Sequence, residues 1–150
     1  MSAATHRYIV VRTGSLDELD AIAEVDATIG RSGACWFGKY GLPIGDSAIK
    51  SKAGVEVAVH AVLVQSEKTE ECGYSYGLYR LNALRRSKPP SGPVPDYYKR
   101  VMHRFGCWLD LSAYDGPEAT LSDLVVSSSL NPLLFALRSS VRGHFTCRLK

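Results

Sequence analysis

The order of apolar and polar positions predicts a chain made mainly of strands. Residues 8–12 (YIVVR) are a β-branched and aromatic run that stops at Thr13 and Gly14, as a strand before a turn would. Residues 55–64 (VEVAVHAVLV) are apolar at nearly every position, which is typical of a strand at the centre of a sheet. Further segments have the composition of strands: residues 74–84, 107–111 and 144–149.

Helix signals are fewer and shorter. SLDE at residues 15–18 is a capping box, and apolar positions then recur at helical spacing until Gly33 ends the helix. Thr120 is the predicted N-cap of a short helix or turn within TLSDLVV. A third helix is predicted in NPLLFALR, with Asn131 as its cap and Pro132 as its first residue.

This order of elements predicts the fold class. Strands joined by loops rather than by long helices indicate a largely antiparallel, curled sheet, so we expect an α+β fold, a small β-barrel with short helices packed around it. Residues 87–96 hold four prolines, which excludes a helix or a central strand there. We expect a single domain over residues 1–150, alone or as part of a longer protein.

Composition excludes several classes of protein. A hydrophobic share of 45% supports a packed core, but no apolar run approaches the roughly 20 residues that cross a bilayer. With no secretory signal at the N-terminus, we expect a cytoplasmic protein, or a nuclear one in a cell with a nucleus, that has no membrane contact. The cysteines form no C-x-x-C pair, so we expect free buried thiols, no metal site and no cofactor.

Charge is distributed unevenly, although the net charge is only +3. Residues 15–30 are acidic, whereas residues 80–104 carry seven basic side chains against Asp96 alone, and the last twenty residues hold no acid. This split predicts one face that approaches a polyanion, the alternative being a solvated basic surface without a partner. The predicted phosphate contacts are Lys39, Arg85, Arg86, Lys88, Lys99, Arg100, Arg104, Arg138, Ser139 and Arg142.

Enzyme motifs are absent from the sequence. It has no Walker loop, dinucleotide fingerprint, HExxH or nucleophile elbow, so we expect no enzyme. His60, in an apolar strand, is more typical of a satisfied core residue than of a catalyst. The alternative is a small-molecule-binding protein or hydrolase-like enzyme whose Cys–His or Ser-centred site is assembled in space.

Aromatic residues are the strongest functional signal. GACWFGKYGLPIG, residues 33–45, gathers three rings among four glycines, and further rings stand at residues 97, 98 and 108. Basic side chains flank two of these places, and a base gains roughly 1 to 3 kcal/mol by stacking on a ring. We therefore predict a base pocket, with burial in the core as the alternative, above all for Trp108. Its members are Trp36, Phe37, Tyr40, Tyr97, Tyr98 and Trp108.

The order of these features resembles the PUA-like superfamily, and within it the EVE and YTH domains. The opening YIVVRTGSLDEL, the ACWFG turn, the strand ending GLYRLNAL, and PDYY followed by WLDL each resemble a part of those domains. LSDLVV and LFALRSSVRGHF are similar to their final part, so the match in order covers almost the whole chain.

The resemblance implies a reader that holds a flipped or unpaired modified base in an aromatic cage. Trp36 corresponds to the first wall, and Tyr97 or Tyr98 to the second, where YTH domains use tryptophan. The ligand it implies is methylated or hydroxymethylated cytosine, or N6-methyladenine, with DNA favoured over RNA. It also implies a restriction or defence role in which a nuclease domain or subunit does the cutting. An interaction domain for an acidic protein is a further alternative, and the oligomeric state is left open.

Overall fold

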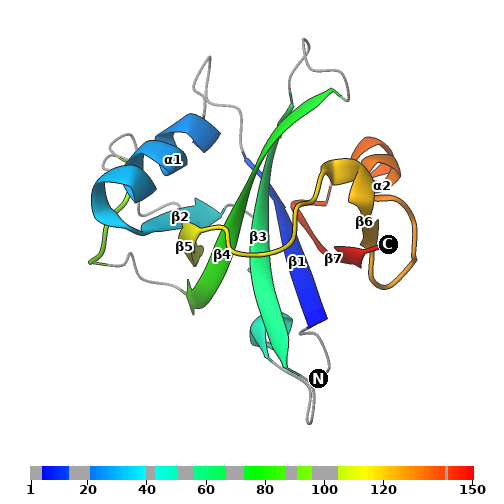
Figure 1. Ribbon diagram of the computed structural model, residues 1–150, viewed down its shortest axis with the longest axis horizontal. Helices are drawn as coiled ribbons and strands as arrows, with labels where there is room; N and C mark the ends of the chain where they lie inside the picture. The colour runs from blue at the N-terminus through cyan, green and yellow to red at the C-terminus, as the bar shows by residue number, and fades with distance from the viewer. Residues whose placement is uncertain are drawn as a thin grey trace.

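The computed structural model describes residues 5–13, 21–39, 43–50, 56–66, 73–86, 91–95, 105–140 and 142–150, with the Asp46 side chain left out. Seven strands and two α-helices make up most of this part of the chain (Figure 1). In chain order the elements are β1 (Thr5–Arg12), α1 (Ala21–Ser32), β2 (Cys35–Lys39), the 3₁₀ helix η1 (Asp46–Ile49), β3 (Val57–Ser66), β4 (Tyr74–Arg86), β5 (Cys107–Ala113), the 3₁₀ helix η4 (Leu121–Asp123), β6 (Leu124–Val126), α2 (Leu133–Ser139) and β7 (His144–Leu149).

These strands form one mixed sheet in the order β2-β5-β4-β3-β1-β7-β6. β1 and β3 run parallel, and the other neighbouring pairs in this order are antiparallel. The sheet is open, because β2 and β6 lie at its two ends and do not pair with each other. The fold is therefore compatible with the predicted α+β class, but the predicted closure into a barrel is wrong.

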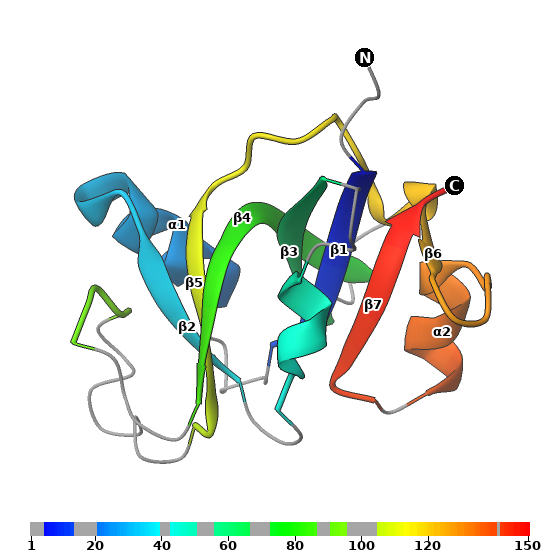
Figure 2. The same ribbon diagram turned by 90° about the horizontal axis from the view of Figure 1, so that it is seen from below.

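Two separate cores explain why the sheet does not close. Ile9 and Val11 of β1 face the core that contains α1, whereas Tyr8 and Val10 face the core that contains α2. β3 alternates in the same way, so the two central strands are buried on both faces, as the apolar run had predicted. Figure 2 shows α1 and α2 at opposite ends of the sheet, each packed against its own strands. The sheet thus covers two small interiors instead of enclosing one.

The aromatic segment predicted as a turn contains an edge strand. β2 pairs antiparallel with β5, and the Trp36 amide donates to the Pro93 carbonyl at 2.8 Å. The short segment 91–95 therefore lies along the outer edge of β2. Cys35 and Phe37 of β2 are buried, so the alternation of side chains determines the conformation here despite the surrounding glycines.

α1 ends where the sequence predicts. Gly33 follows the last helical residue with a φ of 80°, and its amide donates to the Ile29 carbonyl at 2.7 Å. The predicted capping box at residues 15–18 lies outside the described residues. Within the described part of the chain, neither helix has the length and apolar character needed to cross a membrane.

The C-terminal elements correct two predictions. Both the amide and the hydroxyl of Thr120 donate to Asp123, which confirms Thr120 as a cap, but only η4 follows before the chain enters β6, a strand that the sequence analysis missed. Pro132 has an extended ψ of 139° and is the N-cap of α2, so it is not the first helical residue, and Asn131 is not the cap.

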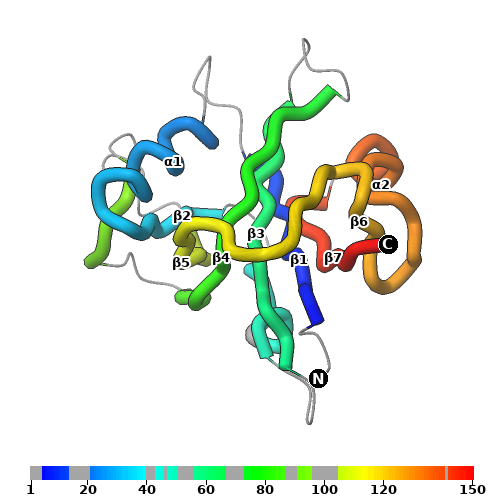
Figure 3. Tube along the Cα trace, in the orientation of Figure 1, coloured from blue at the N-terminus to red at the C-terminus, as the bar shows by residue number. Residues whose placement is uncertain are grey.

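The connection from β5 to η4 crosses the sheet. Figure 3 shows this segment, in yellow, running from the β5 end to the β6 end in front of β3 and β1. It brings the ring of Tyr114 within 5.0 Å of the ring of His60, measured between centroids. Residues 114–117 therefore cover the part of β3 that carries His60.

Candidate functional site

A cleft of about 500 Å³ opens between the start of β1, the end of β7 and η1. Its polar lining includes His6, Arg7, His144 and Arg148, together with the hydroxyl groups of serine and threonine residues. Among the described residues that line it, none is an aspartate or a glutamate. An anionic group would meet positive or neutral donors on several sides there.

Arg7 is a structural part of this cleft. Its Nη1 donates to the carbonyls of Ala48 at 2.6 Å and Lys50 at 3.0 Å, with a longer contact to Ser47 at 3.4 Å. These carbonyls belong to η1 and the residue after it. Arg7 therefore fixes η1 against β1, which leaves Arg148 as the exposed arginine of the cleft wall.

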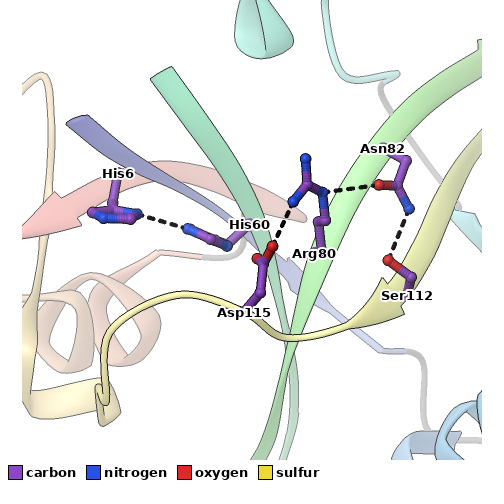
Figure 4. Close-up of polar contacts among 6 residues, drawn as sticks. All are labelled: His6, His60, Arg80, Asn82, Ser112 and Asp115. Atoms are coloured by element: carbon purple, nitrogen blue, oxygen red, sulfur yellow. Dashed lines mark hydrogen bonds and ion pairs between the residues drawn. The ribbon is translucent and has the colours of Figure 1, made fainter. Parts of the chain in front are cut away.

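His6, which lines the cleft, is hydrogen-bonded to a buried histidine, His60. His6 Nδ1 and His60 Nε2 lie 2.9 Å apart, and the two rings are stacked with centroids 5.1 Å apart (Figure 4). Tyr8 is the registered partner of His60, so His6 and His60 lie on the same face of the parallel β1–β3 pair. Since each ring has two nitrogens, one proton is shared between Nδ1 and Nε2 when both rings are neutral.

His60 is enclosed by rings and is 1% exposed. Its centroid lies 5.0 Å from those of both Tyr8 and Tyr114. The two tyrosine hydroxyls share a 2.8 Å hydrogen bond, and that of Tyr114 also donates to the Pro117 carbonyl. Burial and the Tyr114 hydroxyl raise the pKa of Tyr8 far above its usual range. The Tyr8 phenol is therefore neutral, and the hydrogen bond between the two hydroxyls holds the crossing segment over His60.

The electrostatics of this cluster favour a neutral imidazole. Burial lowers the pKa of His60 below its ordinary 6.5, and the positive field of His6 and of Arg80 lowers it further, against an opposing effect of Asp115. His60 Nδ1 is buried and has no hydrogen-bond partner among the described residues. His60 is thus a core residue as expected, but not a fully satisfied one.

A polar network begins directly beside His60 (Figure 4). His60, Arg80 and Ser112 are registered partners on β3, β4 and β5. Arg80 forms an ion pair with Asp115 through Nη1, and its Nε donates to Asn82 Oδ1 at 3.2 Å. Asn82 Nδ2 in turn donates to Ser112 Oγ at 3.0 Å. The network fixes the directions of three polar side chains on one face of the sheet.

The predicted base-pocket residues lie in different environments. Phe37 and Trp108 are 4% and 0% exposed, so both lie in the core. For Trp108, burial in the core was the alternative that the sequence favoured over a base pocket. Trp36 is partly buried, and its indole faces Gly92 closely enough that a Cβ there would lie 2.6 Å from Nε1. The other three members, Tyr40, Tyr97 and Tyr98, lie outside the described residues. The aromatic cage therefore stays a prediction, and Trp36 is its one expected member that is described and partly exposed.

Trp36 shares a face of the sheet with the polar network. It is the registered partner of Asp110 on β5, and Ser112 stands two residues further along the same strand. Because side chains alternate along a strand, Asp110 and Ser112 point to the same side. Burial raises the pKa of Asp110, so this carboxylate stands in a partly desolvated position.

Lys39 is not a surface contact for phosphate. It is 3% exposed, and burial lowers the pKa of its ammonium group. A Cβ at Gly143 would lie 3.4 Å from Lys39 Nζ, which places this charge beside the turn into β7. Burial and the charges of Lys39 and Arg142 together lower the pKa of His144. Lys39 thus lies in the core and not on the surface, and its charge acts on the cleft residue His144.

Of the other predicted phosphate contacts, Arg86 and Arg142 lie near the cleft. Arg86 donates through Nη2 to the carbonyl of Ile44, a cleft residue, at 3.2 Å. Arg142 lies two residues before the cleft residue His144, and its Cζ is 5.7 Å from the centroid of the Phe145 ring. Ser139 Oγ donates to the Phe135 carbonyl within α2. Arg85 and Arg138 are exposed, and the remainder lie outside the described residues: Lys88, Lys99, Arg100 and Arg104.

The thiols and hydroxyls of the described residues do not form a nucleophilic centre. Burial raises the pKa of both Cys35 and Cys147 to about 12, so each is protonated at neutral pH. Cys107 is free and buried as well, as predicted for these thiols. Within the described residues, no serine hydroxyl is hydrogen-bonded to a histidine ring, and no three His, Cys, Asp or Glu side chains are grouped to hold a metal ion.

Sequence reasoning missed His6, Asp115 and Arg148 as site residues. They stand in three different segments, and the strand register brings His6 to His60 while the crossing segment brings Asp115 to Arg80. No local motif joins residues so far apart in sequence. The isolated polar position of His60 in an apolar strand was the one available signal.

Comparison of the chain with family models, with curated proteins and with solved structures found no match. The resemblance to PUA-like domains therefore stays an expectation from the order of sequence features.

Proposed function

We propose that this protein is a nucleic-acid-binding module that holds backbone phosphates in the cleft between β1, β7 and η1. The observation that supports this proposal is the lining of the cleft, where Arg148, His144 and several hydroxyl groups stand without a described carboxylate among them. Arginine, hydroxyl and amide donors make most of the contacts between proteins and phosphates. Arg86 and Arg142, beside the cleft, extend the positive field.

The module reads a modified base, either methylated or hydroxymethylated cytosine or N6-methyladenine, with DNA favoured over RNA. The resemblance to EVE and YTH domains supports this part, as does the placement of Trp36 on the same face as the polar side chains of β4 and β5. In a restriction or defence system, cutting would come from another domain or a partner.

The alternative of a Cys–His or Ser-centred enzyme is less favoured. Cys147 lines the cleft together with His144, but its pKa of about 12 leaves almost no thiolate at neutral pH. Ser127 also lines the cleft and has no hydrogen bond to a described histidine. A binding role needs neither group to be activated.

Fluorescence anisotropy with labelled oligonucleotides tests the proposal. DNA and RNA strands that carry cytosine, 5-methylcytosine, 5-hydroxymethylcytosine, adenine or N6-methyladenine are titrated at low and moderate salt. We expect binding that weakens steeply with salt, and a preference for one modified base that Trp36→Ala removes. Arg148→Gln weakens binding to every strand, because a phosphate contact carries no sequence information.

Arg31→Gln is the matched control for Arg148→Gln. Arg31 is exposed in the last turn of α1 and does not line the cleft, yet the variant loses the same charge. If the two variants weaken binding equally, the loss comes from net charge alone, and the proposed phosphate site in the cleft is wrong. Absence of binding to every strand at low salt would overturn the nucleic-acid proposal itself.

A further inference from the structure

A second, smaller hollow lies next to the cleft. It measures about 200 Å³, and its polar lining consists of His60, Arg80, Asn82 and Asp115. η1 separates the two spaces, because Ala48 lines the cleft while the next residue, Ile49, lines the hollow. The His6–His60 hydrogen bond crosses from one space to the other.

The hollow presents a hydrogen-bond donor beside an acceptor. Arg80 uses Nη1 for Asp115 Oδ2 and Nε for Asn82, which leaves Nη2 without a partner among the described residues. Asp115 Oδ1 likewise accepts no hydrogen bond from them. The Arg80 and Asp115 side chains are 54% and 51% exposed, so a ligand can reach both.

Buried His60 is an independent sign of a ligand. It is 1% exposed, lines the hollow, and its Nδ1 has no partner among the described residues. Leaving a buried polar nitrogen unpaired costs free energy, and each such group in a native protein calls for an explanation, which can be strain, a bound water or ion, or a functional role. His60 lines the hollow, while its Nδ1 itself is covered by protein atoms.

The charges of the hollow favour a neutral ligand. The carboxylate of Asp115 offsets the guanidinium of Arg80, whereas the neighbouring cleft has no described carboxylate in its lining. Ile49, which is partly exposed, adds an apolar surface suited to the face of a flat ring. A nucleobase is such a ligand, since its edge carries a donor next to an acceptor, and carboxylate, amide and guanidinium groups are the side chains that read base edges.

We propose that the hollow beside His60 binds the edge of one unpaired nucleobase whose phosphate lies in the adjoining cleft. This inference rests on the proposed nucleic-acid binding and names the residues that read the base: Arg80, Asn82 and Asp115. Asn82 and Ser112 position the guanidinium through the hydrogen bonds described above. His6 and His60 form the wall between the phosphate and the base.

The test compares two fluorescein-labelled single strands that differ at one central nucleotide, which is a base in one and an abasic site in the other. We expect the wild-type protein to bind the base-containing strand about tenfold more tightly, as one well-formed pair of hydrogen bonds to a base edge provides. Repeating the series with adenine, cytosine, guanine and thymine at the central position identifies the preferred edge.

Asp115→Asn makes the result decisive. The variant removes one negative charge, so electrostatics alone predicts tighter binding of both strands. A base pocket predicts the opposite for the base-containing strand, and the tenfold preference over the abasic strand disappears. Glu118→Gln is the matched control, because Glu118 is an exposed carboxylate three residues further along the same segment and is outside the hollow lining.

The outcomes separate this inference from the proposed function. Equal binding of the two strands by the wild-type protein, or equal effects of Asp115→Asn and Glu118→Gln, would overturn the base pocket and leave phosphate binding in the cleft intact. Failure of both strands to bind would overturn the proposed function and the pocket together. Asp115 is half exposed, and an unchanged thermal midpoint for the variant shows that folding is not the cause.

Discussion

His6 and His60 are 54 residues apart in sequence, yet His6 Nδ1 lies 2.9 Å from His60 Nε2 across the parallel pair β1–β3. The pair joins two features of the molecule, the basic cleft and the small polar hollow. Because His60 is enclosed by Tyr8 and Tyr114, it is held in its neutral form. Proton uptake by His60 is therefore coupled to unfolding.

Stability depends on pH through His60 and His144. Burial lowers the pKa of both in the folded protein, whereas in the unfolded chain both return to about 6.5. Below that pH the unfolded chain binds more protons, so the free energy of unfolding falls as the pH drops from about 7.5 to about 5.5. Urea titrations at the two pH values measure this difference. His144→Asn reduces it, and an undiminished difference in the variant would contradict the assignment.

We expect substitution by alanine to lower the stability of the protein at Gly38 and to raise it at Gly30. A Cβ at Gly38 would lie 2.5 Å from the ring of Phe105, which packs edge-on against Trp108, so Gly38→Ala costs about 1 to 3 kcal/mol of unfolding free energy. Gly30, inside α1, has no atom within 4 Å of such a Cβ, and Gly30→Ala stabilises the protein by about 0.5 to 1 kcal/mol. Urea titrations measure the free energy of unfolding of both variants. No loss of stability in Gly38→Ala would show that the Phe105 ring moves aside at no cost.

Arg12 is a clamp for the end of α2. Its guanidinium donates to the carbonyls of Leu137 and Ser140, both at 2.6 Å, and of Arg142 at 2.9 Å. A lysine keeps the charge but cannot reach three carbonyls at once, so Arg12→Lys costs about 1.5 to 3 kcal/mol. Hydrogen exchange detects faster opening of α2 in this variant. Arg31→Lys is the control, and an equal loss of stability in the control would rule out the clamp.

Thiol alkylation reports on the folded core. Burial raises the pKa of Cys35 and Cys147 to about 12, so in the native protein iodoacetamide modifies neither at about pH 8. In concentrated urea both react, because the thiols recover their ordinary pKa and become accessible. Mass spectrometry of proteolytic fragments follows each site separately. Rapid modification of Cys35 in the native protein would mean that α1 opens away from β2.

Much of the fold was predictable because its signals are local. The apolar run at residues 55–64 indicated a strand buried on both faces, and Gly33 marked the end of a helix. β2 was missed because a five-residue strand among glycines has too short a pattern, and it is β5 and the Pro93 carbonyl that hold it extended. The aromatic cage stays a prediction, and two of its expected members, Phe37 and Trp108, lie in the core because hydrophobic rings near glycines also fill cores.

The sequence alone determined the strand segments of β1, β3, β4, β5 and β7, the buried thiols and the uneven charge, because each depends on residue type and on neighbours a few positions away. Tertiary structure decided which polar groups meet. The parallel pairing of β1 with β3 joins His6 to His60, and the segment that crosses the sheet brings Asp115 to Arg80. The strand register and the path of the crossing segment depend on packing between distant parts of the chain. Both faces of the central strands β1 and β3 must be buried, and this requirement fixes their positions in the sheet. A cleft and a hollow defined by residues from four strands are therefore not encoded in any one segment.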